Sequence, residues 1–226
     1  MPDSTRFKVN EIFFSLQGEG SRAGRPCLFI RLTGCPLRCA YCDTTYAYQE
    51  GTTMEMEEIL EEVKRRLGLP GKGPNAPFVE LTGGEPLAHA EAPRLLRALL
   101  DLGFEVALET AGSHDIAAVP REVVKILDRK TPGSGESARW LESNLAHLVP
   151  GQDELKFVLS SQADYAWSRD WCAERGLFER FDILFSPVWG ELDIRWLAER
   201  IIADRLPVRY QLQLHKTIWG PDKKGV

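Results

Sequence analysis

Three of the five cysteines lie within eight residues, at Cys35, Cys39 and Cys42, and their spacing is C-x3-C-x2-C. Thiols this close in sequence are poorly placed for pairwise disulfides of normal geometry, but they can converge on one metal centre. Soft thiolates select zinc, copper(I) or iron–sulfur clusters. Structural zinc sites and electron-transfer clusters normally have four protein ligands, so three cysteines leave one metal position open for chemistry.

Two other interpretations of these cysteines stay open at this point. A zinc site could use a distant histidine as its fourth ligand, and three unrelated buried cysteines would need no metal. Cys27 is a rival ligand because it lies close to Cys35 in the sequence. Because Cys27 and Cys172 have apolar or helix-like surroundings, we interpret both as small buried hydrophobic residues.

Length, composition and charge indicate what kind of protein this is and which partners are disfavoured. The chain has 226 residues, 43% of them hydrophobic and 27% charged, with a formal net charge of −5, which predicts one folded domain over residues 1–226. The negative charge disfavours nucleic acid as a partner, and no apolar run approaches the ~20 residues of a membrane span. Residues 1–10 lack the apolar segment of a signal peptide. With an odd, clustered cysteine count, this predicts a cytoplasmic protein with no membrane partner.

Alternating strand and helix patterns must position the cysteines. Strands are expected at 8–14, 27–33, 78–82, 104–109, 123–128, 154–159, 181–185 and 208–214. A capping-box pattern at 52–55 predicts a helix over 56–67, and further helical segments are expected at 90–102, 137–147, 163–175 and 192–204. A Pro/Gly loop is expected at 71–77. This order predicts an α/β fold, a partial, open parallel β/α barrel of six to seven strands.

The unusual loops all follow predicted strands. The cysteine loop follows the strand at 27–33, Thr82–Pro86 follows the next, and Glu109–Gly112, Asp128–Lys130 and Ser186–Pro187 follow three others. Ligands of parallel β/α folds bind at the carboxyl ends of the strands. We therefore expect these loops to surround one site.

The cysteine spacing after an apolar strand, together with Gly83-Gly84-Glu85-Pro86, resembles the radical S-adenosylmethionine (SAM) enzymes. The resemblance implies that Cys35, Cys39 and Cys42 hold a 4Fe-4S cluster whose fourth iron binds SAM. It also implies that SAM is contacted by Tyr41, Cys42, Asp43, Gly84, Glu85, Asp128, Arg129, Lys130 and Ser186. Ser134 is a weaker candidate for the same role.

Further segments along nearly the whole chain resemble one family within that class, the 7-carboxy-7-deazaguanine synthases. They are Leu16–Gly20, Arg31, Cys42-Asp43-Thr44, Leu81–Pro86, Glu109–Gly112, Glu154–Phe157 and Gln211–Lys216; Ala111 stands where the family usually has asparagine. The resemblance implies a carbon–nitrogen lyase of queuosine and 7-deazapurine biosynthesis. It would contract the ring of 6-carboxy-5,6,7,8-tetrahydropterin to 7-carboxy-7-deazaguanine with loss of ammonia.

The same resemblance implies roles for residues on both sides of the cysteines. An N-terminal loop with Leu16, Gln17 and Gly18 would bind substrate, together with Arg31 and Thr82, and Thr44 would bind Mg²⁺. His215 closes the last predicted strand as a possible substrate contact, and the tail 217–226 follows it. A homodimer and an electron donor such as flavodoxin or ferredoxin are also implied. A glycyl-radical activase and a non-enzymatic metal-binding module stay open as alternatives.

Overall fold

The structure, a computed structural model, describes residues 5–69 and 77–226; the predicted loop at 71–77 lies almost wholly outside them. The described residues form nine strands: β1 Arg6–Leu16, β2 Pro26–Leu32, β3 Thr52–Glu55, β4 Phe78–Gly83, β5 Glu105–Thr110, β6 Val124–Asp128, β7 Glu154–Leu159, β8 Asp182–Pro187 and β9 Arg209–Tyr210. The α-helices are α1 Met56–Leu67, α2 Ala92–Asp101, α3 Gln162–Glu174, α4 Ile194–Ala203 and α5 Leu214–Trp219. Short 3-10 segments are η1 Thr45–Tyr48, η2 Pro86–Ala88, η3 Pro132–Ser134, η4 Ser137–Arg139 and η5 Glu142–Ala146.

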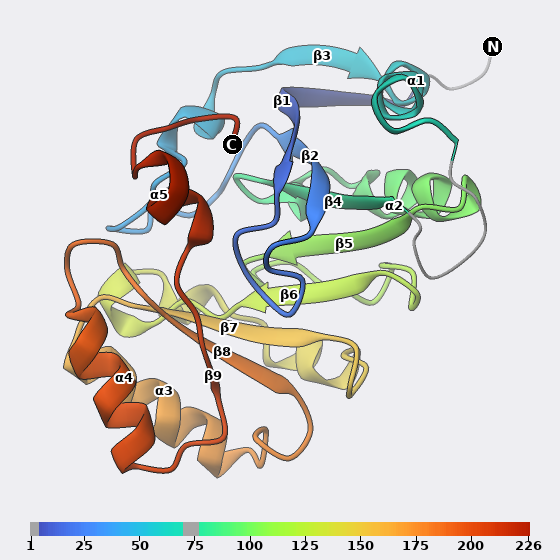
Figure 1. Ribbon diagram of the computed structural model, residues 1–226. Helices are drawn as coiled ribbons and strands as arrows, with labels where there is room; N and C mark the ends of the chain where they lie inside the picture. Colours follow the sequence, from blue (N-terminus) through green and yellow to red (C-terminus); the bar gives the residue numbers. More distant parts are fainter. Residues whose placement is uncertain (1–4, 70–76) are drawn as a thin grey trace.

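One curved sheet organises the molecule (Figure 1). Its strand order is β3-β1-β2-β4-β5-β6-β7-β8-β9. The seven strands from β2 to β9 in this order pair in parallel, whereas β1 pairs antiparallel with both β2 and β3. The edge strands β3 and β9 do not pair with each other. The predicted open parallel β/α barrel of six to seven strands is therefore confirmed.

Alternation along the strands separates two faces of this sheet, because successive strand side chains point to opposite sides. On β2, Leu28, Ile30 and Leu32 are fully buried in the main core, which also contains the apolar residues of the helices. Cys27 and Phe29 belong instead to a smaller apolar cluster with Phe78 and side chains of β5 and β6. Toward the carboxyl ends of the strands, the residues that follow on this same face are polar, such as Arg31 on β2 and Thr82 on β4. The inner face therefore changes from apolar packing to a polar site.

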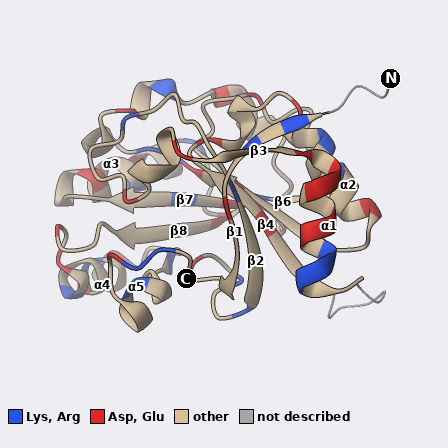
Figure 2. Ribbon diagram, turned by 90° about the horizontal axis from the view of Figure 1, so that it is seen from above, with Lys and Arg blue, Asp and Glu red and all other residues tan. Residues whose placement is uncertain are grey.

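The helix predicted at 56–67 is confirmed as α1, but the segment before it differs from the sequence prediction. Residues 52–55 form strand β3, paired with Arg6–Val9 of β1, and the capping box is made by Glu55 and Glu58 instead of starting at Thr52. Because threonine side chains favour strands, the free edge of β1 captures this segment before the helix begins. Acidic residues in the first turn of α1 and basic residues in its last turn complement the helix dipole, red and then blue in Figure 2.

The other helices test the remaining predictions. The helices predicted at 90–102, 163–175 and 192–204 are confirmed as α2, α3 and α4, with ends shifted by one or two residues. The segment 137–147 is not one helix but the two short 3-10 segments η4 and η5. No helix among the described residues is long and apolar enough to cross a membrane.

The predicted last strand at 208–214 is also wrong in extent. Strand β9 contains only Arg209 and Tyr210, paired with Leu184 and Phe185. Beyond it the side chains of Gln211 and Gln213 both donate to Glu19, at 3.0 and 2.9 Å. The chain leaves the sheet to make these bonds, and α5 then begins at Leu214. The alternation of Gln and Leu therefore reflects contacts with another loop.

Candidate active site

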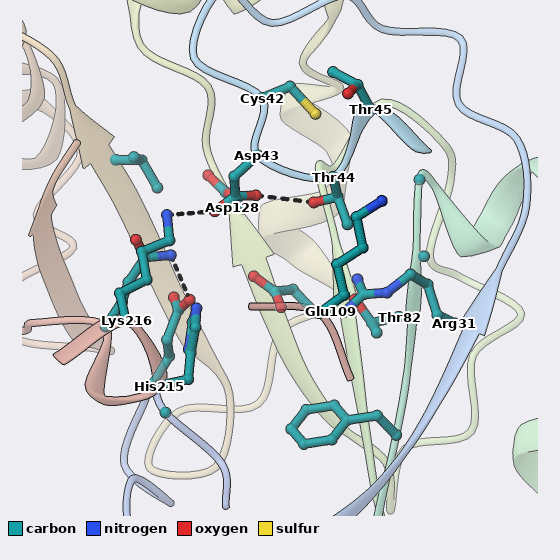
Figure 3. Close-up of a pocket in the computed structure, with 18 of the residues that line it drawn as sticks. Arg31, Cys42, Asp43, Thr44, Thr45, Thr82, Glu109, Asp128, His215 and Lys216 are labelled. Carbon is teal, nitrogen blue, oxygen red and sulfur yellow. Dashed lines mark hydrogen bonds and ion pairs between the residues drawn. The ribbon is translucent and has the colours of Figure 1, made fainter. Parts of the chain in front are cut away.

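A cavity of about 560 Å³ lies at the carboxyl ends of the parallel strands, and most of the predicted site residues line it (Figure 3). All but four of the residues predicted for cluster, SAM, substrate and magnesium are on its wall. The exceptions are Glu85, Arg129, Ser186 and the weaker candidate Ser134, which is 1% exposed. The expected convergence of the loops that follow the strands is what brings these residues together.

The cysteine loop forms one side of the cavity. Cys35, Cys39 and Cys42 are partly buried free thiols on the cavity wall. The loop is tied to the segment that follows β6, because the Arg38 N–H donates to Glu136 Oε1 at 2.7 Å and the Ala40 N–H donates to the Ser134 carbonyl at 3.0 Å. Burial raises the pKa of the Cys39 thiol to about 11, so metal binding must displace its proton.

The geometry of these thiols separates the metal interpretations. In the part of the chain that the structure describes, no three His, Cys, Asp or Glu side chains are grouped as ligands of a metal ion. In a cluster each thiolate binds a different iron, so the three sulfurs need not meet at one point. The rival ligand Cys27 is fully buried in the inner apolar cluster of the sheet. A loop with three partly buried thiols beside a cavity therefore fits a 4Fe-4S cluster, which Cys35, Cys39 and Cys42 would hold.

The glycine loop after β4 packs directly against the cysteine loop. The Gly84 N–H donates to the Leu32 carbonyl at 3.1 Å, and the Glu85 N–H donates to the Gly34 carbonyl at 2.8 Å. A Cβ at Gly84 would clash with the Gly34 carbonyl oxygen and would lie 2.7 Å from Cys35 Cβ. Glycine is thus required here by the close approach of another backbone.

Glu85 lies outside the cavity wall, unlike most of the residues predicted to contact SAM. Its carboxylate is fully buried and accepts hydrogen bonds from the Leu87 N–H, the Thr110 hydroxyl and the Ala111 N–H. The side chain joins the loop after β4 to the loop after β5 and does not line the cavity. The Glu85 carbonyl also accepts from the Ala88 N–H, at 3.1 Å, so Glu85 mainly holds the loops together.

The three predicted residues at the end of β6, Asp128, Arg129 and Lys130, do not all point to the same side of the chain. Asp128 and Lys130 line the cavity and pair at 2.7 Å. Arg129 points away from the cavity, because its guanidinium lies over the rings of Trp140, Trp167 and Trp171. Alternation along the extended chain makes opposite directions unavoidable for neighbours. Ser186 on β8 is 1% exposed and does not line the cavity.

Arg31 and its neighbours form the wall next to the cysteine loop. Arg31 Nε pairs with Glu11 Oε1 at 2.8 Å, and the Tyr46 hydroxyl donates to the same carboxylate oxygen at 3.1 Å. Thr82 is the register partner of Arg31 on β4. Arg31 uses Nε for this pair, so its terminal nitrogens can serve a ligand in the cavity.

The amide of Gln17 is oriented by the protein itself. Its Nε2 donates to Glu80, and its Oε1 accepts from the Glu19 N–H at 3.0 Å. The backbone N–H and carbonyl of Gln17 are bonded to Arg25 and Gly24. Both ends of the amide that the sequence suggested for substrate are thus already paired, although Gln17 stays on the cavity wall.

Buried charges under the cavity were missed by the sequence analysis. Lys156 pairs with Glu19 at 2.5 Å and with Glu109 at 2.7 Å. Glu80 lines the same cavity, and we call these four residues the floor of the cavity. Charged side chains in buried strands are rare unless they are paired. The single charges inside the apolar segments 78–81 and 155–159 were the available signal. The cavity therefore presents buried carboxyl oxygens as hydrogen-bond acceptors.

Asp43, Thr44 and Lys216 line the cavity together, and Asp43 contacts the other two. Lys216 Nζ pairs with Asp43 Oδ2 at 2.5 Å, and the Thr44 hydroxyl donates to Asp43 Oδ1 at 2.9 Å. Burial alone would raise the pKa of Asp43, but the charge of Lys216 holds it well below its usual range. Asp43 is therefore an anion at neutral pH, next to a hydroxyl oxygen.

The C-terminal segment returns to the site. His215 lies on α5 and not at a strand end, and its Nδ1 is packed against Gly18. Burial lowers the pKa of His215, so its imidazole is neutral at pH 7. Residues 221–226 also line the cavity, and Lys224 Nζ lies 4.1 Å from the centre of the Tyr46 ring. The tail beyond His215 thus covers part of the mouth.

Glu80 leads to a prediction about pH and stability. Burial, followed by the charges of Glu109 and Glu19, raises the pKa of Glu80 well above 4.5. The folded protein then holds this proton more tightly than the unfolded chain, so stability falls as pH rises above about 4.5. Glu80→Gln keeps an oxygen acceptor for Gln17 and has no proton to lose. We expect a stability gain over wild type that grows between pH 4.5 and 8, measured by urea unfolding of the cofactor-free protein.

Glu105→Gln is the matched control for that series. Burial raises the pKa of Glu105, but bonds from Arg25 and Arg22 outweigh this and lower it, so its contribution is present above pH 4.5 and lost in acid. Glu105→Gln should therefore destabilise the protein at neutral pH. A Glu80→Gln gain that stayed constant with pH would contradict the assignment.

Comparison with known proteins agrees with this site. The model of the Radical SAM superfamily matches residues 29–131, which include β2, the cysteine loop and Lys130. The crystal structure of QueE from Escherichia coli is similar with a TM-score of 0.73 and 24% identity, covering 92% of this chain and 94% of that chain. Fold, cysteine loop and family model together define a radical SAM enzyme.

Two relatives narrow the class. The 7-carboxy-7-deazaguanine synthase of Chlorobaculum tepidum is 45% identical over 228 residues, covering 100% of both chains. That of Koribacter versatilis is 41% identical, covering 97% of this chain and 100% of the relative. The chain belongs to the 7-carboxy-7-deazaguanine synthase family. Membership implies a 4Fe-4S cluster, SAM and a small-molecule substrate in 7-deazapurine biosynthesis, and it disfavours the activase and the non-enzymatic module.

Proposed function

We propose that this enzyme converts 6-carboxy-5,6,7,8-tetrahydropterin to 7-carboxy-7-deazaguanine and ammonia. The observation that carries the proposal is a single cavity with the three thiols on one side and Arg31, Thr82 and buried carboxylates on the other. Substrate and products differ only by the released ammonia, so the conversion needs no net oxidant or reductant. Cys35, Cys39 and Cys42 would hold the cluster, and the cluster together with SAM would supply the radical chemistry that begins at C6 of the pterin.

The chain's own residues would hold and orient the substrate. Arg31 offers a guanidinium to the substrate carboxylate. Glu109 and Glu80 line the same cavity as Arg31 and would offer oxygen acceptors to the N–H groups of the pterin ring. Residues 221–226 and α5 cover the mouth and exclude water from the reacting carbon. Positioning is the main contribution that such a site makes to the rate.

Substrate analogues test the role of the carboxylate. The reconstituted enzyme should form an ultraviolet-absorbing deazapurine from 6-carboxytetrahydropterin, and 6-methyltetrahydropterin should give no product and bind at least about tenfold more weakly, since one charge-assisted pair is lost. Equal binding of the two pterins would contradict the proposed orientation.

Arg31→Met removes the cation and keeps most of the side-chain volume. Loss of a charge-assisted pair of about 1.5–3 kcal/mol should raise the KM for the carboxylated pterin about 10- to 100-fold. The affinity for SAM should change little, because Arg31 lies on β2 before the cysteine loop. Steady-state kinetics against each ligand separate the two effects, and a rise in the KM for SAM alone would oppose the assignment.

Magnesium is proposed at Thr44. The hydroxyl of Thr44 and the carboxylate of Asp43 are hard oxygen donors beside the cavity, and magnesium keeps its other positions for water and substrate oxygens. Thr44→Val should remove most of the stimulation of turnover by added magnesium, whereas Thr45→Val, a change at the next hydroxyl, should keep it. Initial rates over a magnesium titration measure this, and equal stimulation in both variants would count against Thr44.

Several wider properties stay proposals. The electron donor would be a flavodoxin or ferredoxin, the protein would be a homodimer, and it would act in the cytoplasm as the single domain 1–226. These rest on resemblance to the family and on the cysteine content of the sequence.

A further inference from the structure

The side chain of Arg129 is anchored outside the cavity. It is 6% exposed, and its guanidinium carbon lies 5.2, 4.8 and 5.2 Å from the ring centres of Trp140, Trp167 and Trp171. Nη1 donates to the Lys130 carbonyl and to the Ser137 carbonyl, both at 2.8 Å. Arg129 therefore joins the two ends of the segment 130–137 from behind.

The segment 130–137 in turn holds the cysteine loop. Its Ser134 carbonyl accepts from the Ala40 N–H, and the Glu136 carboxylate accepts from the Arg38 N–H. These two amides flank Cys39 on either side. The segment also begins with Lys130, whose ammonium faces the cavity and pairs with Asp128. One buried side chain is thus bonded to the segment that supports both the cysteine loop and the cavity wall after β6.

We propose that Arg129 is a positioning residue for the cluster and SAM. Its two carbonyl bonds fix the segment 130–137, which holds Cys39 and Lys130 in the relative placement that both cofactors need. Arginine suits this role because its planar group stacks on aromatic rings while its N–H groups reach two carbonyls. The proposal needs only the cofactors that family membership implies, so its failure would leave the proposed substrate unaffected.

Arg129→Met tests the proposal, and Arg175→Met is the matched control. Arg175 lies over the same Trp171 ring at 4.4 Å but bonds to Glu142 and the Trp171 carbonyl, not to the segment 130–137. In the cofactor-free protein, hydrogen exchange at the amides of Arg38 and Ala40 should quicken about tenfold or more in Arg129→Met and stay near wild type in Arg175→Met.

Binding of SAM to the reconstituted protein is the second readout. The Kd for SAM should rise about tenfold in Arg129→Met, with the KM for the pterin unchanged. The Kd of Arg129→Lys should lie between those of wild type and Arg129→Met, because one ammonium cannot reproduce the planar fork of a guanidinium. Glu136→Ala, a change nearer the surface, should free the Arg38 amide and weaken SAM binding without disturbing the tryptophans. Unchanged exchange and unchanged SAM affinity in Glu136→Ala would overturn the proposal even if Arg129→Met failed to fold. Equal effects in Arg175→Met would also overturn it.

Discussion

Cys39→Ala is expected to yield a folded protein that holds little iron and forms no detectable product. Loss of a residue that only orients a metal ligand costs about 10–100-fold in affinity or activity, and loss of a ligand itself should exceed that range. The Arg38 and Ala40 amides on either side stay bonded to Glu136 and Ser134, so the loop should keep its path. Iron and sulfide content, visible absorption and turnover after anaerobic reconstitution provide the measurement.

Cys172→Ala is the control for that variant. Cys172 is fully buried in the main core, and burial raises the pKa of its thiol to about 12. Its replacement should cost about 1 kcal/mol of stability through lost packing and leave the iron content unchanged. If Cys39→Ala retained turnover, or if Cys172→Ala lost its iron, the assignment of the three ligands would be wrong.

Gly84→Ala should have the second largest effect, although it adds a single methyl group. The new Cβ would meet the Gly34 carbonyl oxygen and Cys35 Cβ, and neither can move without shifting the cysteine loop. A displacement of about 1 Å at a reacting group can cost about 100-fold in rate. We therefore expect turnover to fall by about that factor and the yield of reconstituted cluster to drop.

Gly34→Ala separates crowding from backbone strain. Gly34 has a φ of +105°, but a Cβ there would meet no heavy atom within 4 Å. This variant should cost about 1–3 kcal/mol of stability from the left-handed conformation and affect turnover less than Gly84→Ala does. Thermal unfolding and kcat measured on both variants decide the matter. A larger loss of kcat in Gly34→Ala would show that strain, and not contact between the loops, dominates.

The parallel strands and the cysteine loop could be predicted because their signals are local. Apolar segments such as 27–33 and 154–159 repeat at β/α spacing, and loops after parallel strands must meet at one edge. The thiol spacing predicts a metal centre without any knowledge of partners distant in sequence. Cys27, one strand length earlier, is interpreted from the sequence as a small buried hydrophobic residue, and its place in the inner apolar cluster confirms this.

What could not be predicted depends on partners far away in the sequence. Thr52–Glu55 is a strand because β1 offers a free edge, and β9 is short because Gln211 and Gln213 bond to Glu19. The direction of Arg129 depends on three tryptophans from two other segments. Tertiary contacts of this kind override local propensity.

The buried charges of the floor illustrate the same limit. Glu80 and Lys156 each stand alone within an apolar strand, which signals a paired or functional charge. Folding brings Lys156 of β7 between Glu109 of β5 and Glu19 of the loop that follows β1. Sequence alone suggests that such residues matter but does not identify their partners.

The most direct test of the central claim is the product balance of the reconstituted enzyme. Under anaerobic conditions with reductant, SAM and 6-carboxytetrahydropterin, 7-carboxy-7-deazaguanine and ammonia should form in equal amounts. Both should depend on SAM, and their amount should exceed the amount of SAM consumed. The claim would be contradicted if the enzyme cleaved SAM with its cluster intact but released neither the deazaguanine nor ammonia.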